Sequence, residues 1–285
     1  MFNIETKRNP LALVLAVYGI CFLCRIWEYF ILRTDQTFWG EAFLHKLAGI
    51  AILLLALRLC RLSLKSIGFG FSNGLGQLLG GLAFGLLVFL PAYLTEIALL
   101  AAQNKTPSLE IYVSAYAVDG NSSQQTALIF FIICLLGNII NVIMEEGVFR
   151  GLFQKLLENK YSFIAAACLS ALLFGFWHIM APLRSYYDGT MSFNGLIANA
   201  LLLVSTSALV GFKFSLLTKL TNSLYMAMGH HFINNAIVNM LHVASSSGAD
   251  ELMVLRISIA QVVSFIIVLI WYILAKVKHS AFVIS

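Results

Sequence analysis

Residues 75–101 read LGQLLGGLAFGLLVFLPAYLTEIALLA, an apolar stretch in which Glu96 is the one charged side chain. A helix of this composition satisfies the roughly 20 apolar residues that the hydrocarbon core of a bilayer requires. Runs of the same kind recur on both sides of it, at about 10–32, 42–60, 125–146, 162–181, 193–212, 222–243 and 254–276. The sequence therefore predicts an all-α, polytopic membrane bundle of about eight transmembrane helices.

The composition of the whole chain supports an integral membrane protein. Of its 285 residues, 60% are hydrophobic and only 11% are charged, with a mean hydropathy of +0.88. Soluble domains carry about 25% charged residues. No repeat or low-complexity segment stands out, so we expect one transmembrane domain over residues 1–285. The net charge of +5 comes from basic residues in loops, and no nucleic-acid partner is predicted.

Lysine and arginine gather in alternate connections between the apolar runs, and this pattern orients the bundle. Cytoplasmic loops are the ones enriched in these residues. The basic connections hold Lys7 and Arg8; Arg58, Arg61 and Lys65; Arg150, Lys155 and Lys160; Lys213 and Lys219; and Lys276 and Lys278. Both termini are therefore predicted to face the cytoplasm. The first apolar run is expected to be a retained helix rather than a cleaved signal peptide.

Two small-residue patterns, Gly76-x-x-x-Gly80 and Gly81-x-x-x-Gly85, occur in the stretch quoted first. Glycines four residues apart let two helix backbones approach closely. We interpret both patterns as helix-packing sites.

Polar residues enter an apolar run in the segment Asn138-Ile-Ile-Asn141-Val-Ile-Met-Glu145-Glu146-Gly-Val-Phe-Arg150. On a helix, Asn138, Asn141 and Glu145 share one stripe. Glu146 and Arg150 lie four residues apart on a neighbouring face, in the order that favours an ion pair. That pair leaves Glu145 free to point elsewhere. The simpler alternative is that both glutamates cap the end of a membrane helix.

Two further stretches carry histidines. Phe174 and His178 lie one turn apart, so the phenyl ring can pack against the imidazole and set its orientation. Residues 229–235 read GHHFINN, in which His231 and Asn235 share one helix face. An unpartnered polar group at mid-membrane costs several kcal/mol, so this cluster is interpreted as functional.

The depths of these groups predict a long helix. If the helix over 125–146 stopped at its last residue, Glu145 would lie about 25 Å from His178, at about 1.5 Å per residue. The conflict disappears if this helix continues, tilted, to about Glu158 before the chain turns. We therefore predict one helix that reaches Glu158.

The three motifs, in this order, resemble the CAAX prenyl endopeptidase and bacteriocin-processing family, also called CPBP or Abi intramembrane proteases. The matching residues are Glu145-Glu146-x-x-x-Arg150, Phe174-x-x-x-His178 and His231-x-x-x-Asn235. Each motif is weak alone, whereas the ordered set within a membrane bundle is specific. The resemblance covers about residues 125–245, the expected catalytic core.

The resemblance and the chemistry of these residues together imply peptide hydrolysis. Glu145 is the expected general base for water, and His178 is expected to position that water. His231 and Asn235 are expected to stabilise the oxyanion of the tetrahedral intermediate. The other motif residues are expected to hold these side chains in place and to set the electrostatics around them without contacting the substrate: Glu146, Arg150 and Phe174.

Two versions of the mechanism stay open, with zinc and without a cofactor. One carboxylate and two imidazoles form the ligand class of hydrolytic zinc sites, and here the ligands are Glu145, His178 and His231. The other version is a metal-free reaction driven by the glutamate. The sequence lacks H-E-x-x-H, so a zinc site would not have the usual zincin form.

Ionisable residues at membrane depth that fall outside the motifs include a pair in the first apolar run and one in the third. Arg25 and Glu28 lie three apart on one predicted helix and are expected to neutralise each other. Glu96 is expected either at the outer boundary or along a pathway. Convergence of Arg25 and Glu96 with Glu145 would favour a transporter, a class that also places ionisable groups at mid-membrane.

The resemblance implies a substrate that is membrane-embedded or lipid-anchored, such as a prenylated CAAX protein. It also implies a bacterial cell membrane as the location. Besides the transporter, an immunity-type binding scaffold without proteolysis stays open. A scaffold of that kind would not need the motif residues.

Overall fold

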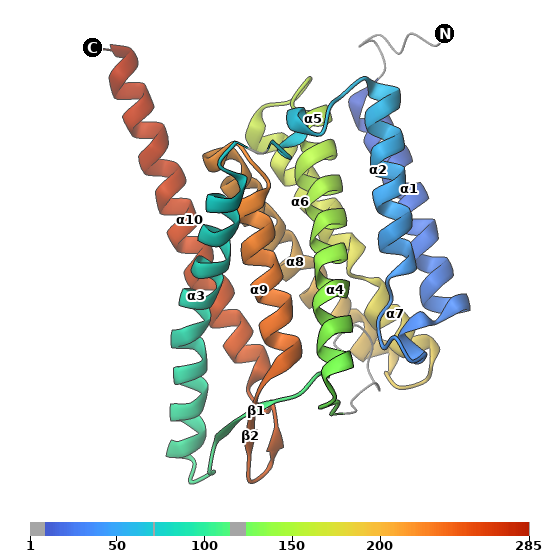
Figure 1. The fold of residues 1–285 in the computed structure, drawn as a ribbon, viewed down its shortest axis with the longest axis vertical. Helices are drawn as coiled ribbons and strands as arrows, with labels where there is room; N and C mark the ends of the chain where they lie inside the picture. Colours follow the sequence, from blue (N-terminus) through green and yellow to red (C-terminus); the bar gives the residue numbers. More distant parts are fainter. Residues whose placement is uncertain (1–8, 71, 115–123, 285) are drawn as a thin grey trace.

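The apolar runs fold into a bundle of helices with a small antiparallel sheet at one end (Figure 1). The structure is a computed structural model and describes residues 9–70, 72–114 and 124–284. The helices are α1 (Pro10–Trp27), α2 (Leu44–Cys60), α3 (Gly74–Ala102), α4 (Leu128–Glu145), α5 (Gln154–Leu157), α6 (Phe163–Trp177), α7 (Met180–Tyr187), α8 (Phe193–Thr221), α9 (Tyr225–Met240) and α10 (Met253–Ile284). Shorter helical turns cover Glu28–Leu32, Thr34–Gln36 and Lys65–Ile67.

The start of α1 and the end of α10 lie at the same end of the bundle, opposite the sheet (Figure 1). A chain that crosses the bundle an even number of times begins and ends on the same side. The basic residues Lys7 and Arg8, which entered the predicted orientation, lie outside the described residues.

Six helical segments are long and apolar enough to cross a membrane, so the chain is an integral, multi-pass membrane protein. Among the described residues these segments are Pro10–Gln36, Gly74–Ala102, Leu128–Leu157, Phe163–Tyr187, Phe193–Thr221 and Met253–Lys278. Two of the eight predicted spans, over 42–60 and 222–243, correspond to shorter helices. α2 has 17 residues and α9 has 16. A helix of 16 residues extends only about 24 Å, against the roughly 30 Å of a bilayer core.

α9 is short because the chain becomes extended at Leu241, inside the predicted span. Strand β2 (Leu241–Ser245) pairs antiparallel with β1 (Ser108–Ile111) on one side and β3 (Gly248–Ala249) on the other. The Tyr93 hydroxyl donates a hydrogen bond of 2.6 Å to the Leu241 carbonyl. The predicted all-α class is confirmed for the bundle, and this small sheet is an addition at one end that the sequence did not predict.

The predicted long helix is confirmed. α4 continues without a break through a π-helical segment, Glu146–Phe153, into α5, and the helical run ends at Leu157. Every residue of the π-helical segment is buried. π-Helical turns inside α-helices are frequent at functional sites, because they change where consecutive side chains point.

The glycine-packing prediction holds for the second pattern. A Cβ atom on Gly81 would lie 2.2 Å from the Met226 carbonyl oxygen of α9, and one on Gly85 would lie 2.7 Å from Ile233. α3 and α9 can therefore approach closely only because these positions lack side chains. Gly80 has no neighbour within 4 Å among the described residues, so the first pattern does not form the same kind of contact.

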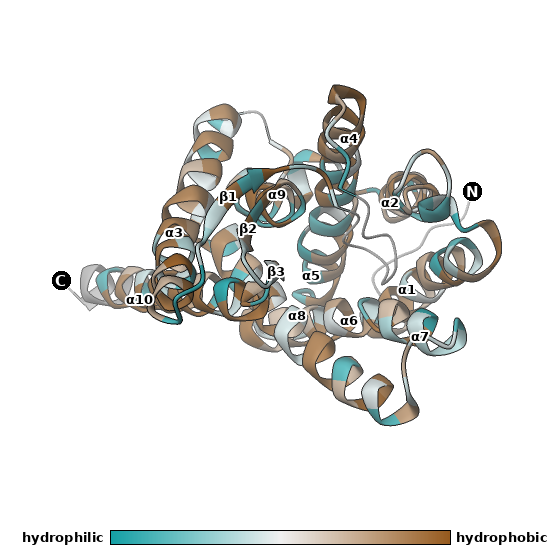
Figure 2. Cartoon of the chain, turned by 90° about the horizontal axis from the view of Figure 1, so that it is seen from below, coloured by the Kyte–Doolittle hydropathy of each residue, from teal (hydrophilic) through white to brown (hydrophobic). Residues whose placement is uncertain are grey.

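The outer surface of the bundle is apolar, as expected for a protein surrounded by lipid. Hydropathy colouring shows apolar residues over much of each long helix (Figure 2). Leu87 is 66% exposed, Leu128 73% and Leu201 65%. Charged side chains such as Glu96, Arg184 and Arg256 are instead fully buried. These charged groups at membrane depth are thus enclosed by the protein and are not exposed to lipid.

Candidate active site

Two consecutive glutamates stand where α4 changes into the π-helical segment. Glu145 is the last residue of α4 and Glu146 the first of the π-helical segment, and both are at least 96% buried. Both carboxylates reach the same imidazole on α9. His231 Nδ1 lies 2.8 Å from Glu146 Oε1, and His231 Nε2 lies 3.6 Å from Glu145 Oε2. His231 is thus held between two acids.

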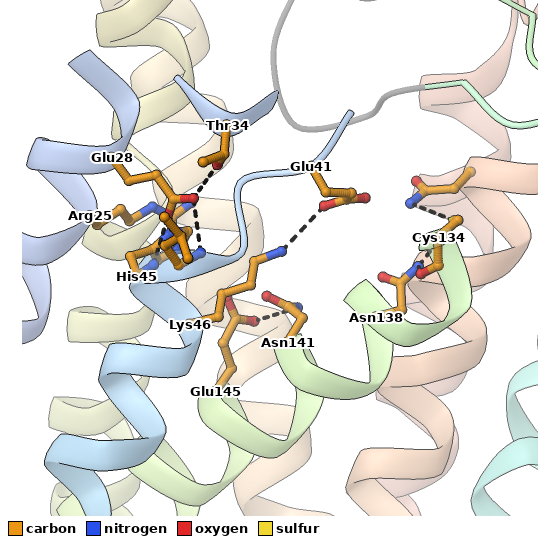
Figure 3. A network of polar contacts seen from close by, with 12 residues as sticks. Arg25, Glu28, Thr34, Glu41, His45, Lys46, Cys134, Asn138, Asn141 and Glu145 are labelled. Carbon is orange, nitrogen blue, oxygen red and sulfur yellow. Dashed lines mark hydrogen bonds and ion pairs between the residues drawn. The ribbon is translucent and has the colours of Figure 1, made fainter. Parts of the chain in front are cut away.

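Glu145 is also held by two neutral donors. The Trp177 indole Nε1 donates a hydrogen bond of 2.9 Å to Oε1. The Asn141 amide donates one of 3.3 Å to Oε2, and the two residues lie together on α4 with Lys46 of α2 beside them (Figure 3). A buried carboxylate needs such donors, because it has lost its hydration shell. The stripe of Asn141 and Glu145 predicted for this helix is therefore present.

Trp177 was missed as a functional candidate. The sequence places it beside His178 near a helix end, where a tryptophan is most often an interfacial residue. It is instead fully buried at the end of α6. The Arg25 guanidinium lies 4.4 Å from its ring, and the ring of His45 packs 5.7 Å away. The burial of Trp177 depends on α1 and α2, and no local pattern could have indicated it.

His178 terminates α6, and its ring is oriented as the spacing predicts. The Phe174 ring packs edge-on against the imidazole, with centroids 4.7 Å apart. His178 Nδ1 lies 2.9 Å from the Phe174 carbonyl oxygen. A carbonyl only accepts, so Nδ1 carries the proton and Nε2 of the neutral ring is unprotonated. Among the described residues, Nε2 has no hydrogen-bond partner, which leaves it available to a ligand or water.

Arg150 lies behind the two acids, as its spacing from Glu146 predicts. Its Nε is 3.4 Å from Glu146 Oε2 and donates a hydrogen bond of 3.3 Å to the Gly211 carbonyl. The guanidinium is 4.0 Å from the centre of the Phe174 ring. A Cβ atom on Gly211 would lie 2.8 Å from the guanidinium, so α8 needs a glycine here to admit it. Arg150 therefore links α4, α6 and α8 around Glu146.

The predicted residues converge to different degrees. Glu145, Glu146, His231 and Arg150 are in direct contact. Glu145 also interacts electrostatically with His178, which is joined to the group through Phe174. Within the described residues, Asn235 forms no hydrogen bond with any of these side chains. Its Oδ1 instead accepts a hydrogen bond of 3.3 Å from the amide of Asn234.

The donor set of Glu145, His178 and His231 belongs to the class that zinc uses, and each imidazole is oriented through its Nδ1 as metal-bound histidines are. The positions do not fit a metal centre. Within the described ranges, no three His, Cys, Asp or Glu side chains stand close enough together to hold an ion. We therefore derive no reaction step through a metal.

The expected ion pair between Arg25 and Glu28 is wrong. Arg25 donates a hydrogen bond of 3.1 Å to the Tyr29 hydroxyl. Glu28 accepts hydrogen bonds from the first backbone amides of α2, at Leu44 (2.9 Å) and His45 (2.5 Å), and also contacts the His45 ring (Figure 3). A carboxylate at a helix N-terminus is stabilised by the unpaired amides and the helix dipole, which outcompete the arginine.

The match to known proteins covers the part of the chain that holds this site. Residues 126–237 match the sequence profile of the Rce1-like type II CAAX prenyl endopeptidases. The matched range begins before α4 and ends two residues after Asn235, and it includes every residue of the three motifs. No curated protein matches the chain.

Proposed function

The chain contains an Rce1-like type II CAAX prenyl endopeptidase domain, a protease domain, and from this premise we propose that it cleaves a membrane-anchored protein near its C-terminus. The substrate class is a lipid-anchored or membrane-embedded polypeptide, of which a prenylated CAAX-type end is the example named by the family. The observation that carries the proposal is the buried Glu145, hydrogen-bonded on both oxygens and facing two imidazoles.

In the proposed reaction, Glu145 accepts a proton from a water molecule as the water oxygen bonds to the scissile carbonyl carbon. The carbonyl π electrons move to the oxygen and form an oxyanion. Glu145 then returns the proton to the amide nitrogen as the C–N bond breaks. The products are a carboxylic acid and an amine, which become carboxylate and ammonium by transfer of the acid proton to the amine, and no oxidant or reductant is needed.

His178 and His231 have different parts in this proposal. His178 offers its unprotonated Nε2 to the water, because Phe174 holds the proton of that ring at Nδ1. His231 is proposed to stabilise the oxyanion together with Asn235. Since Glu146 takes the hydrogen bond of Nδ1, donation from Nε2 requires the imidazolium form, and the flanking acids compensate its charge.

The membrane orientation is also part of the proposal. We propose that α2 and α9 cross with the six longer segments, so that both termini face the cytoplasm. The common position of the start of α1 and the end of α10 supports an even number of crossings (Figure 1). The remaining loop charges of the sequence favour the cytoplasmic side for that end. Arg150 and Lys213, which the sequence placed in loops, are instead buried within helices and do not count toward this orientation. A bacterial cell membrane stays a prediction.

The contacts of Glu96 weigh against a transporter. Convergence of Arg25 and Glu96 with Glu145 would have favoured that alternative. Arg25 does lie over Trp177, which donates to Glu145. Glu96, by contrast, forms a buried ion pair with Arg256 of α10. A fully buried carboxylate that is already paired has no need of a transported ion.

The test is cleavage of a farnesylated CAAX-type reporter peptide by the full-length protein reconstituted in vesicles. Glu145→Gln keeps the size of the side chain but removes its basicity, so the rate should fall by about 10²–10⁴-fold. Glu158→Gln is the control, because Glu158 lies near the end of the same helical run, where it contacts Gln154 and the half-exposed Lys219 and not the site residues. Wild-type cleavage by Glu145→Gln would contradict the role of Glu145. Intact biological function without cleavage would favour the binding scaffold.

Metal content of the same preparations decides between the two versions of the mechanism. Stoichiometric zinc that is lost in both Glu145→Gln and His231→Ala would favour the zinc version. Full activity after exhaustive chelation, with no zinc in the protein, would favour the glutamate alone.

A further inference from the structure

A second buried polar cluster lies behind the candidate active site, where α8, α9 and α10 meet. Its centre is Lys213, whose side chain is fully buried. The ammonium Nζ lies 2.9 Å from His230 Nε2, 2.7 Å from Gln261 Oε1 and 2.8 Å from Ser264 Oγ. An ammonium has three donors and no acceptor. Its three protons therefore meet three neutral acceptors, one on α9 and two on α10.

This lysine fixes the direction of a chain of side-chain amides. In its protonated form Lys213 only donates, so the atom of Gln261 that faces it is the oxygen. The Gln261 nitrogen then faces α9, where it donates a hydrogen bond to Asn234 Oδ1. The Asn234 nitrogen in turn donates to Asn235 Oδ1, at 3.3 Å. Each amide leaves the next one a single favourable orientation.

The last amide in the chain belongs to a predicted site residue. With its oxygen taken by Asn234, Asn235 keeps both protons of its own amide nitrogen, and among the described residues that nitrogen has no partner. A flipped amide would turn the Asn235 oxygen outward and place two donors against each other at Asn234. The network therefore selects the orientation in which Asn235 is a donor.

We propose that Lys213, Gln261 and Asn234 are positioning residues that hold the Asn235 amide with its nitrogen directed to the substrate carbonyl. The inference rests on the proposed function, in which Asn235 stabilises the oxyanion. Gln261 lies on α10, outside the matched range 126–237. The inference therefore adds a helix to the site that the family match does not cover. An oxyanion donor must be oriented before the charge develops, and a directional network performs that task.

The decisive variant is Gln261→Glu. It keeps the shape of the side chain and gives Lys213 an ion pair, but it replaces the donor to Asn234 by an acceptor. Asn234 must then turn to donate, and Asn235 must turn in response and present its oxygen. We expect kcat to fall by about 10²–10³-fold with KM within about twofold of wild type, and no loss of thermal stability.

Gln261→Ala separates orientation from structure. It removes the directional contact without reversing it, so Asn235 can still adopt the donor orientation. The factor by which kcat falls should therefore be about ten times smaller than in Gln261→Glu. If Gln261 had a purely structural role, Gln261→Ala would lower kcat more than Gln261→Glu. Alanine leaves a cavity and two unpaired groups, whereas glutamate fills the space and gains an ion pair. Ser264→Ala is the control, since it removes another partner of Lys213 and leaves the amide chain in place.

Asn235→Ala distinguishes the failure of this inference from the failure of the proposed function. If Asn235→Ala retains wild-type kcat, Asn235 is not an oxyanion donor and the proposed function loses that role. If Asn235→Ala loses kcat while Gln261→Glu retains it, only the positioning network is overturned. The inference is supported if kcat falls in both Asn235→Ala and Gln261→Glu and falls less in Gln261→Ala than in Gln261→Glu.

Discussion

Two of the buried groups of charged side chains in this bundle differ in how their members are paired. The first, here called the corner cluster, joins α3, the sheet and α10 through Glu96, His242, Asp250 and Arg256. Arg256 forms ion pairs with Glu96 and, at 2.9 Å, with Asp250. His242 contacts Asp250 at 2.5 Å and stacks on Tyr112 with ring centroids 3.8 Å apart.

The candidate active site contains a similar set of groups, with acids, an arginine and histidines. Glu146 is paired on both sides, by Arg150 and His231. Glu145 instead has neutral hydrogen-bond donors and a histidine at 3.6 Å. His178 Nε2 and the Asn235 amide nitrogen have no partners among the described residues.

The difference separates a structural use of buried charge from a chemical one. In the corner cluster each charge lies against an opposite charge, and the product is a fixed junction of two helices and a sheet. In the site the supporting residues are paired, but the groups that would touch substrate keep free donors and acceptors. Incomplete pairing at membrane depth is costly, and it persists where a ligand completes it.

The largest effect on this comparison is expected from Arg256→Leu, which removes the central cation of the corner cluster. Glu96 would remain buried without its partner, so the free energy of unfolding should fall by about 3–5 kcal/mol. Thermal unfolding of the purified protein in detergent measures this change. Arg58→Leu, at an exposed position of α2, is the control. An unchanged unfolding temperature would show that the corner cluster is not a structural junction.

A smaller effect, on catalysis rather than folding, is expected from Trp177→Phe. The substitution removes one hydrogen bond to a charged group, a contribution of about 1.5–3 kcal/mol, so kcat should fall about 10–100-fold. The matched control is Trp271→Phe, because Trp271 is 40% exposed on α10. Cleavage kinetics at a temperature where both variants are folded provide the measurement. Equal rates for the two variants would mean that the indole does not support Glu145.

The smallest effect is expected from acid. Burial raises the pKa of Asp250, but the hydrogen bonds from His242 and Arg256 outweigh it, and the pKa lies below the ordinary value of 3.8. A lowered pKa stabilises the fold at pH above 3.8 and loses this contribution as the pH falls through the lower folded value. Asp250→Asn should therefore flatten the acid branch of the stability profile by about 1 kcal/mol or less. A parallel acid branch in both proteins would contradict this.

The sequence by itself determined the membrane bundle, the long helix and the pairs that lie one turn apart. Apolar runs of about 20 residues have few alternatives to a membrane helix, because backbone groups in lipid must pair within their own segment. Pairs such as Glu146 with Arg150, and Phe174 with His178, follow from the helical repeat alone. The rise per residue of a helix also showed that Glu145 and His178 could lie at similar depths only if the helix continued past Glu146. The end of the helix near Glu158 could therefore be predicted.

Only the tertiary structure decided which distant residues complete these pairs. Trp177 reaches Glu145, Arg256 neutralises Glu96, and Gln261 sets the direction of the Asn234 amide, each across many residues of chain. The same holds for the short α9, which ends where β1 offers a pairing edge to Leu241. Spacing along a helix predicts which side chains share a face. It does not predict what that face meets, because contacts between helices depend on the packing of the whole bundle.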